Sequence, residues 1–147
     1  MDTIGYKTIK VLADMANYTT VINWVVEQCM QAKITTSFAT KLQIAVEEIF
    51  VNIASYAYPP KEGDVEISYY YDDKLNQIEM TFIDSGKPYN PLTEAKQPDI
   101  TLSAEERPIG GLGLFIVKNT MDYVNYEYSD GKNIFTIRMN IDTSDNN

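Results

Sequence analysis

The stretch "AVEEIFVNIASYAYPP", residues 45–60, indicates a helix whose two faces differ in chemistry. At about 100° per residue, its apolar side chains fall on one arc that suits packing against a sheet. Glu48 and Asn52 lie one turn apart on a separate polar stripe, which also holds Lys41 and Ser55. Periodicity alone favours a solvent-exposed stripe, yet asparagine is a poor residue for a helix interior. A carboxylate and an amide at this spacing could instead serve a substrate hydroxyl and a hard cation.

The composition suits one globular domain spanning residues 1–147. A net charge of −9 repels phosphate backbones and anionic membranes, so we expect no direct nucleic-acid or membrane partner. The absence of histidine excludes a Ser-His-Asp or Cys-His nucleophile, and the single Cys29 suggests a buried structural thiol. The first residues lack the layout of a signal peptide, and no run reaches the length of a membrane span. We therefore expect a cytoplasmic protein.

The hydrophobic periods predict the element order β-α-α-β-β-loop-α-β-β. The predicted strands are 6–13, 64–73, 76–84 and two joined by "SDGK" within 123–141, and the predicted helices are 17–33, 40–58 and 112–122. Hairpin-joined strands imply an α/β (α+β) sandwich of two layers, with a mixed, mostly antiparallel sheet and helices on one face. The proline-containing loop 85–111 is long for a compact domain, so we expect it to be functional or mobile.

Two further stretches could carry chemistry. In "FIDSGKPYNP" (82–91), Asp84 and Gly86 follow a strand; such a pair is often only a turn, but a buried carboxylate there could accept a hydrogen bond from an adenine amino group. In "RPIGGLGLFIVKNTMD" (107–122), a glycine-rich loop runs into an apolar helix, whose first amide protons are suited to an anion. Arg107 could reach a terminal phosphate or could simply pair with a neighbouring glutamate.

In order, E-x-x-x-N, D-x-G and G-G-x-G-L resemble the N, G1 and G2 boxes of the GHKL ATPase superfamily, which has the Bergerat fold of histidine kinase-like ATPase domains. Within it, the chain is most similar to the anti-sigma factor serine/threonine kinases. The likeness covers nearly the whole chain. It implies a domain that binds ATP and Mg²⁺ beneath a mobile lid.

The resemblance also implies roles for individual residues. Glu48 matches the catalytic base, and Asn52 matches the Mg²⁺ ligand. Nucleotide contacts are implied for Tyr56, Asp84, Gly86, Arg107, Gly110, Gly111, Leu112, Gly113, Leu114 and Thr136, the last as a hydroxyl that supports adenine beside Asp84. Glu48 lies on the face of Asn52, and Glu47 points about 100° away from Glu48, so we expect Glu47 to face solvent or a partner.

The leading hypothesis is an ATP-Mg-dependent anti-sigma factor with serine/threonine kinase activity. The resemblance implies two protein partners, a sigma factor and an anti-sigma factor antagonist of the STAS type as phosphorylation substrate, and it implies a homodimer. An alternative is an ATP-gated partner-binding module without significant kinase activity, in which nucleotide would order the 87–110 lid. A third reading is a detached catalytic domain that phosphorylates a histidine on another protein.

Overall fold

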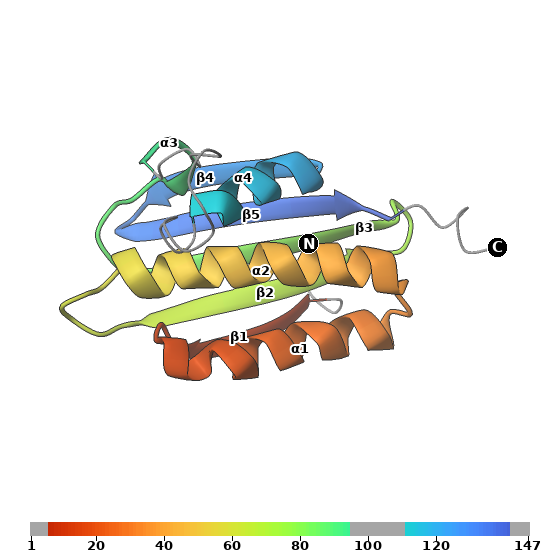
Figure 1. The fold of residues 1–147 in the computed structure, drawn as a ribbon, viewed down its shortest axis with the longest axis horizontal. Helices are drawn as coiled ribbons and strands as arrows, with labels where there is room; N and C mark the ends of the chain where they lie inside the picture. The colour runs from red at the N-terminus through yellow and green to blue at the C-terminus, as the bar shows by residue number, and fades with distance from the viewer. Residues whose placement is uncertain (1–5, 95–110, 142–147) are drawn as a thin grey trace.

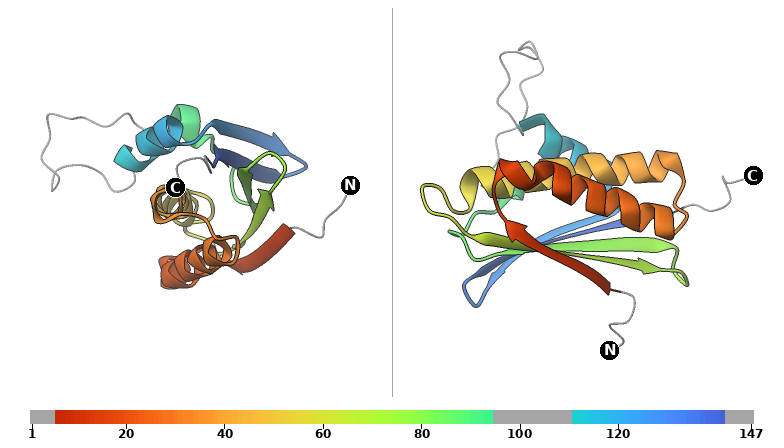
Figure 2. Two further views of the ribbon diagram at one scale, coloured as in Figure 1. Left: turned by 90° about the vertical axis from the view of Figure 1, so that its right-hand side faces the viewer. Right: turned by 90° about the horizontal axis from the view of Figure 1, so that it is seen from below.

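The computed structural model describes residues 6–94 and 111–141, in which helices cover one face of a five-stranded sheet. In chain order the elements are β1 (Tyr6–Leu12), η1 (Met15–Asn17), α1 (Tyr18–Gln31), α2 (Thr36–Tyr56), β2 (Asp64–Asp72), β3 (Gln77–Asp84), α3 (Pro91–Glu94), α4 (Gly111–Thr120), β4 (Tyr123–Ser129) and β5 (Lys132–Asn140). Helix α2 runs across the middle of the sheet, with α1 on one side and α4 on the other (Figure 1). The predicted two-layer sandwich, with its helices on one face, is confirmed (Figure 2).

The strand order is β1-β2-β3-β5-β4. Every pairing is antiparallel, so the sheet predicted to be mostly antiparallel is entirely so within the described residues. The predicted "SDGK" turn is confirmed between β4 and β5, where Asp130 and Gly131 have φ values of 53° and 76°. Two consecutive positive φ values are typical of the type I′ hairpin, which explains the Asp-Gly pair.

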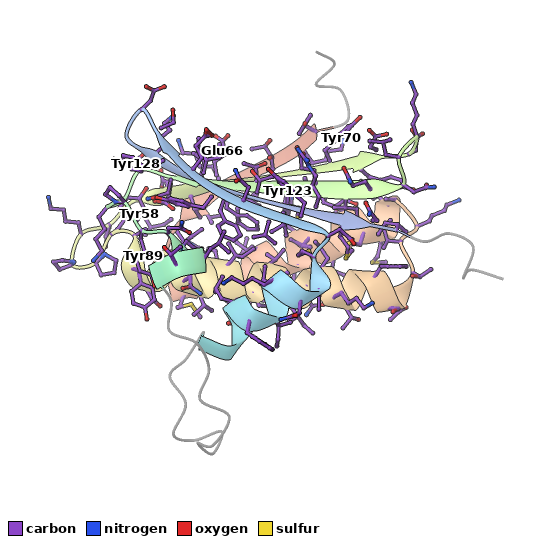
Figure 3. The ribbon with its side chains drawn as sticks, turned by 90° about the horizontal axis from the view of Figure 1, so that it is seen from above. Tyr58, Glu66, Tyr70, Tyr89, Tyr123 and Tyr128 are labelled. Carbon is purple, nitrogen blue, oxygen red and sulfur yellow. The ribbon has the colours of Figure 1, made fainter. Side chains whose placement is uncertain are left out.

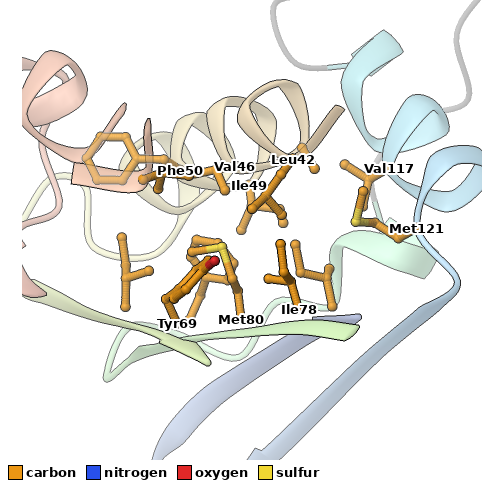
Figure 4. Close-up of a cluster of buried hydrophobic side chains, with 14 of the residues drawn as sticks. Leu42, Val46, Ile49, Phe50, Tyr69, Ile78, Met80, Val117 and Met121 are labelled. Atoms are coloured by element: carbon orange, nitrogen blue, oxygen red, sulfur yellow. The ribbon is translucent and has the colours of Figure 1, made fainter. Parts of the chain in front are cut away.

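The apolar arc of α2 forms the centre of the core (Figure 4). Figure 4 shows this arc above the sheet and beside α4; the labelled side chains are Leu42, Val46, Ile49 and Phe50 of α2, Tyr69, Ile78 and Met80 of the sheet, and Val117 and Met121 of α4. Leu42, Val46 and Phe50 have no exposed surface. Burial of such side chains contributes about 1.5–3 kcal/mol each, so this arc sets the position of α2 and its polar stripe.

Helix α2 differs from its predicted range of 40–58 at both ends. It begins at Thr36, because Thr35 is extended and ends the preceding turn, and the segment read as cap candidates forms the first turn instead. It ends at Tyr56, with Ala57 as its C-cap residue. No helix in the described ranges combines the length and apolar content needed to cross a bilayer.

A one-turn helix, α3, lies inside the segment predicted to be a loop. The Asn90 side chain accepts a hydrogen bond from the Leu92 amide at 2.9 Å, as an N-cap residue does. Pro91 follows at the first helical position, where proline is favoured. The Asn-Pro pair was therefore a start signal that the loop prediction overlooked.

The side chain of Tyr58, which follows α2, links the start of β2 to the segment that follows β3. Its hydroxyl donates to the Asp64 carbonyl at 2.7 Å and accepts from the Ser85 amide at 2.7 Å. The end of β3, where Asp84 lies, is thereby held to the start of β2. Figure 3 shows Tyr58 at the same end of the molecule as Tyr89.

Candidate functional site

A pocket lies between α2, the end of β3, β5 and the start of α4. Most of its wall is apolar, and its polar side chains are Asn52, Asp84 and Asn133 with Tyr89 and Tyr126. Leu114 of α4 completes it and is 3% exposed. An apolar pocket with a few convergent polar groups is the usual form of a small-molecule site. The structure thus brings together Asn52, Asp84 and Leu114, one predicted residue from each of the three motifs.

Asp84 is the buried carboxylate of this pocket, with 5% of its surface exposed. Its Oδ1 accepts from the Gly86 amide and from Asn133 Nδ2, each at 2.9 Å. Among the described residues, Oδ2 accepts no hydrogen bond. Burial raises the pKa of Asp84 above its usual range, and the two hydrogen bonds oppose that rise only in part. Asp84 therefore presents one unpaired acceptor to the pocket.

Gly86 is needed for packing between the Asp84 turn and α2. A Cβ at this position would lie 2.2 Å from the carbonyl oxygen of Ala57, too close for any side chain. The Lys87 amide donates to the same carbonyl at 2.9 Å. This contact with the end of α2 explains the glycine without a ligand, and Gly86 does not line the pocket.

Asn52 is 7% exposed, and its amide orientation is set by its own helix. Nδ2 donates to the Glu48 carbonyl at 2.9 Å, one turn back. The remaining acceptor, Oδ1, is therefore the atom available at the pocket wall. A single amide oxygen, together with phosphate oxygens, is a suitable ligand set for Mg²⁺, which takes few protein ligands. No cluster of three acidic or thiol side chains suited to a metal occurs among the described residues.

Glu48 is half-buried one turn before Asn52, outside the pocket wall. Burial, and to a smaller extent the neighbouring charge of Glu47, raises the pKa of Glu48. No hydrogen bond or ion pair to its carboxylate is found within residues 6–94 and 111–141. A carboxylate with a raised pKa and no partner is suited to accepting a proton.

Glu47 has a different environment from Glu48. It accepts a short hydrogen bond from the hydroxyl of Tyr18, at the start of α1, and this bond raises the pKa of Tyr18 to about 12. Glu47, expected to face solvent or a partner, is partly exposed and is also bonded within its own chain. Glu47 joins α2 to α1, and this leaves Glu48 as the carboxylate on the face of Asn52.

Tyr56 does not line the pocket and is 42% exposed. Its ring stacks on Tyr89, with centroids 5.0 Å apart and planes 20° apart, and Tyr89 does line the pocket. Figure 3 shows Tyr89 beside α3, at the end of α2. Of this stacked pair, Tyr89 is therefore the residue at the pocket wall, and Tyr56 packs against its ring from outside the pocket.

The prediction that Thr136 lies beside Asp84 is wrong. Thr136 pairs with Thr81 on the sheet face away from the helices, whereas the residue opposite Asp84 is Asn133. Asn133 is 5% exposed and was not among the predicted residues. A signal was present, because alternation places Asn133 on the same face as the apolar Phe135 and Ile137.

The glycine-rich segment is described only from Gly111 onward. Helix α4 begins at Gly111 and includes Leu112 and Gly113 in its first turn, followed by Leu114 at the pocket. This places a helix start beside the pocket, as the motif predicted. Arg107 and Gly110, and the lid between residues 95 and 110, lie outside the described residues.

The fold of this chain is similar to that of solved histidine-kinase structures. The histidine kinase AdeS of Acinetobacter baumannii aligns with a TM-score of 0.52 at 14% identity, over 93% of this chain and 70% of that one. The histidine kinase domain of a blue-light-activated kinase of Erythrobacter litoralis aligns with a TM-score of 0.50 at 16% identity, over 70% and 44%. At these identities the likeness shows a histidine-kinase ATPase fold and no more.

The family follows from the sequence match. The family described as "Histidine kinase-like ATPase domain" matches residues 11–139, and the chain belongs to it. Serine-protein kinase RsbW of Listeria monocytogenes serovar 1/2a is 34% identical over 98 residues, or 63% of this chain and 60% of that protein. RsbW of Bacillus mycoides is 29% identical over 97 residues, or 63% and 59%. The matched region thus spans less than two thirds of the length of these relatives.

Proposed function

We propose that this protein is an ATP- and Mg²⁺-dependent serine/threonine kinase that acts as an anti-sigma factor. The observation that carries the proposal is the convergence of Asp84 Oδ2 and the Asn52 amide oxygen on one apolar pocket, with Glu48 one turn away. The RsbW relatives, named as serine-protein kinases, support the reaction class. Its expected partners are a sigma factor and an antagonist protein of the STAS type, and we expect a cytoplasmic homodimer.

Each residue of the site would have a separate role in phosphoryl transfer. Asp84 would hold the adenine amino group, the apolar wall would exclude water from the base, and Asn52 would hold the metal. When bound, ATP supplies the phosphoryl group and Mg²⁺ neutralises its charge. Glu48 would accept the proton of the substrate serine or threonine hydroxyl, a role to which its raised pKa is suited.

The test is transfer of labelled phosphate from ATP to a co-encoded antagonist protein, with the neighbouring glutamates as a matched pair. Glu48→Ala is expected to lower the transfer rate by about 100-fold or more, because general base catalysis contributes factors of that size. Glu47→Ala removes the partner of Tyr18 and is expected to reduce stability while leaving most of the rate. A wild type that transfers phosphate no faster than Glu48→Ala would contradict the kinase assignment.

The same experiment separates the kinase from an ATP-gated binding module. If ATP binding and partner capture persist without any transfer above the Glu48→Ala background, the protein is a nucleotide-dependent binder. An acid-labile product in place of phosphoserine or phosphothreonine would instead indicate transfer to histidine on another protein.

A further inference from the structure

Asn133 is the buried amide at the centre of the pocket's polar network. It is the second residue of β5, it lies directly opposite Asp84 in the β3–β5 pairing, and it is 5% exposed. The pocket side of β5 otherwise carries apolar side chains, as at Phe135. A buried polar group in such a row requires partners, because leaving it unpaired would cost about 1–3 kcal/mol.

The hydrogen-bonding capacity of this amide is fully used within the protein. Nδ2 donates to Asp84 Oδ1 at 2.9 Å and to the Lys87 carbonyl at 2.9 Å. Oδ1 accepts from the Tyr89 amide at 3.2 Å and from the Tyr126 hydroxyl. An asparagine amide has two N–H donors and two acceptor lone pairs, so all four are assigned. Asn133 therefore has no donor or acceptor left for a ligand, although it lines the pocket.

These hydrogen bonds fix the orientation of the Asp84 carboxylate. Two N–H groups, from Gly86 and Asn133, fix Oδ1, and they fix the plane of the carboxylate with it. Oδ2 is then the one oxygen that can meet a ligand. An ionised carboxylate only accepts hydrogen bonds, so a ligand edge with an N–H donor is favoured and a carbonyl edge is opposed.

We propose that Asn133 is a positioning residue: it orients Asp84 so that Oδ2 faces the base, and it thereby sets the preference for a purine with a 6-amino group over one with a 6-oxo group. The proposal rests on the proposed function, because it assumes that the pocket binds a nucleotide. It differs from a purely structural role, in which Asn133 would serve only to hold the 87–89 segment and Tyr126 in place.

The test measures the affinity of the full chain for three Mg²⁺-nucleotides by calorimetry: ATP, purine riboside triphosphate, which lacks the 6-amino group, and inosine triphosphate, which carries a 6-oxo group. Asn133→Ala is expected to weaken ATP binding by about tenfold or more and to change purine riboside triphosphate binding by less than about threefold, since the hydrogen bond to the 6-amino group is the contact affected. The preference over inosine triphosphate should fall in parallel.

Asn133→Leu is a second variant of nearly the same volume. It fills the space of the amide but has no N–H donor for Asp84, so we expect the same loss of preference. It also provides the answer if the alanine variant does not fold. Asn140→Ala is the matched control, because Asn140 lies on the same strand, is exposed and, among the described residues, its side chain bonds only Gln77, at 3.0 Å. This control is expected to bind all three nucleotides as the wild type does.

Two outcomes would overturn the inference while leaving the proposed function intact. One is an equal loss of affinity for all three nucleotides in both Asn133 variants, which would indicate a structural role alone. The other is a wild type that binds ATP and inosine triphosphate equally well. A wild type that binds none of the three would contradict the proposed function itself, and the inference with it.

Discussion

The two faces of the sheet differ in how completely their polar side chains are paired. On the face away from the helices, one row of directly paired residues crosses all five strands: Tyr6, Tyr70, Glu79, Arg138 and Tyr123. These side chains pair with one another, through Tyr6–Tyr70 stacking at 4.6 Å, an Arg138–Glu79 ion pair at 2.7 Å and Arg138 over the Tyr123 ring at 4.4 Å. Figure 3 shows Tyr70 and Tyr123 on this side of the sheet.

On the face toward the helices, polar groups are few and are not all paired. Asp84 Oδ2 and Asn52 Oδ1 meet the pocket without a hydrogen bond among the described residues. Tyr69 also has a buried hydroxyl without a partner there, but it lies in the dense core and lines no described pocket. A buried unpaired polar atom therefore indicates a ligand only where a cavity lies in front of it.

The largest expected effect is on stability, because the two faces of the sheet differ in how tightly their side chains are packed. Phe82→Ala removes a fully buried ring and is expected to lower the free energy of unfolding by about 3–5 kcal/mol. Its neighbour Thr81 lies on the opposite face, and Thr81→Ala is expected to cost less than about 1 kcal/mol. Urea unfolding of both variants measures the difference. Equal losses would show that the outer face is packed as tightly as the core.

The second prediction compares two carboxylates of the same strand. Asp84→Asn places a donor toward the pocket and is expected to weaken ATP binding by about 10- to 100-fold, the worth of a hydrogen bond to a charged group. Glu79→Gln, on the outer row, is expected to leave ATP affinity within about twofold, since hydrogen-bond energy is lost only between contacting groups. Calorimetric titration with Mg²⁺-ATP measures both. A comparable loss in the two variants would remove Asp84 from the site.

The third prediction concerns stability and pH. Because burial raises the folded-state pKa of Asp84 above its unfolded value of 3.8, the wild type loses stability as pH rises through the folded-state pKa. Asp84→Asn does not titrate, so its stability relative to wild type should be lowest below pH 3.8 and should increase toward neutral pH. Urea unfolding across this range measures the difference. A difference that stays constant with pH would contradict the raised pKa.

These pairs also show what the sequence could predict. The arc of α2 and the hairpins followed from local periodicity, which depends only on neighbouring residues. The separation of Glu48 from Glu47 followed from helix geometry, but the Tyr18 partner of Glu47 is 29 residues away and had no local signal. Thr136 was assigned by family likeness without regard to strand alternation, which places it on the outer face.

Asn133 was the more difficult case. Its parity predicted that it points inward, but its role depends on partners in three other segments, at Asp84, at 87–89 and at Tyr126. Contacts of this kind form only when the sheet and its loops are assembled. A single sequence could therefore predict the motifs of the helix and of the strand end, but not the amide that holds Asp84 in place.

A smaller effect tests the unpaired group of the core. Tyr69→Phe removes a buried hydroxyl that has no partner among the described residues, and it is expected to raise the free energy of unfolding by about 1 kcal/mol. Tyr71→Phe is the matched control two residues on, because the Tyr71 hydroxyl donates to Asn76 Oδ1 at 3.2 Å. We expect the control to lose stability. Thermal and urea unfolding measure both, and a loss in Tyr69→Phe would mean that its hydroxyl is paired in solution.

The smallest expected effect belongs to the ion pair of the outer row. The Arg138 and Glu79 side chains are 39% and 23% exposed, so solvent screens their attraction. A double-mutant cycle with Glu79→Gln and Arg138→Gln should give a coupling energy below about 1 kcal/mol, which decreases as salt is raised. Arg138→Gln alone should cost more than Glu79→Gln, because it also loses the contact with the Tyr123 ring. A coupling above about 2 kcal/mol that persists in salt would place the outer row with desolvated networks. The polar pairs of the outer face would then contribute to stability despite their exposure, and the two faces would differ in packing and in the pocket rather than in the strength of their polar pairs.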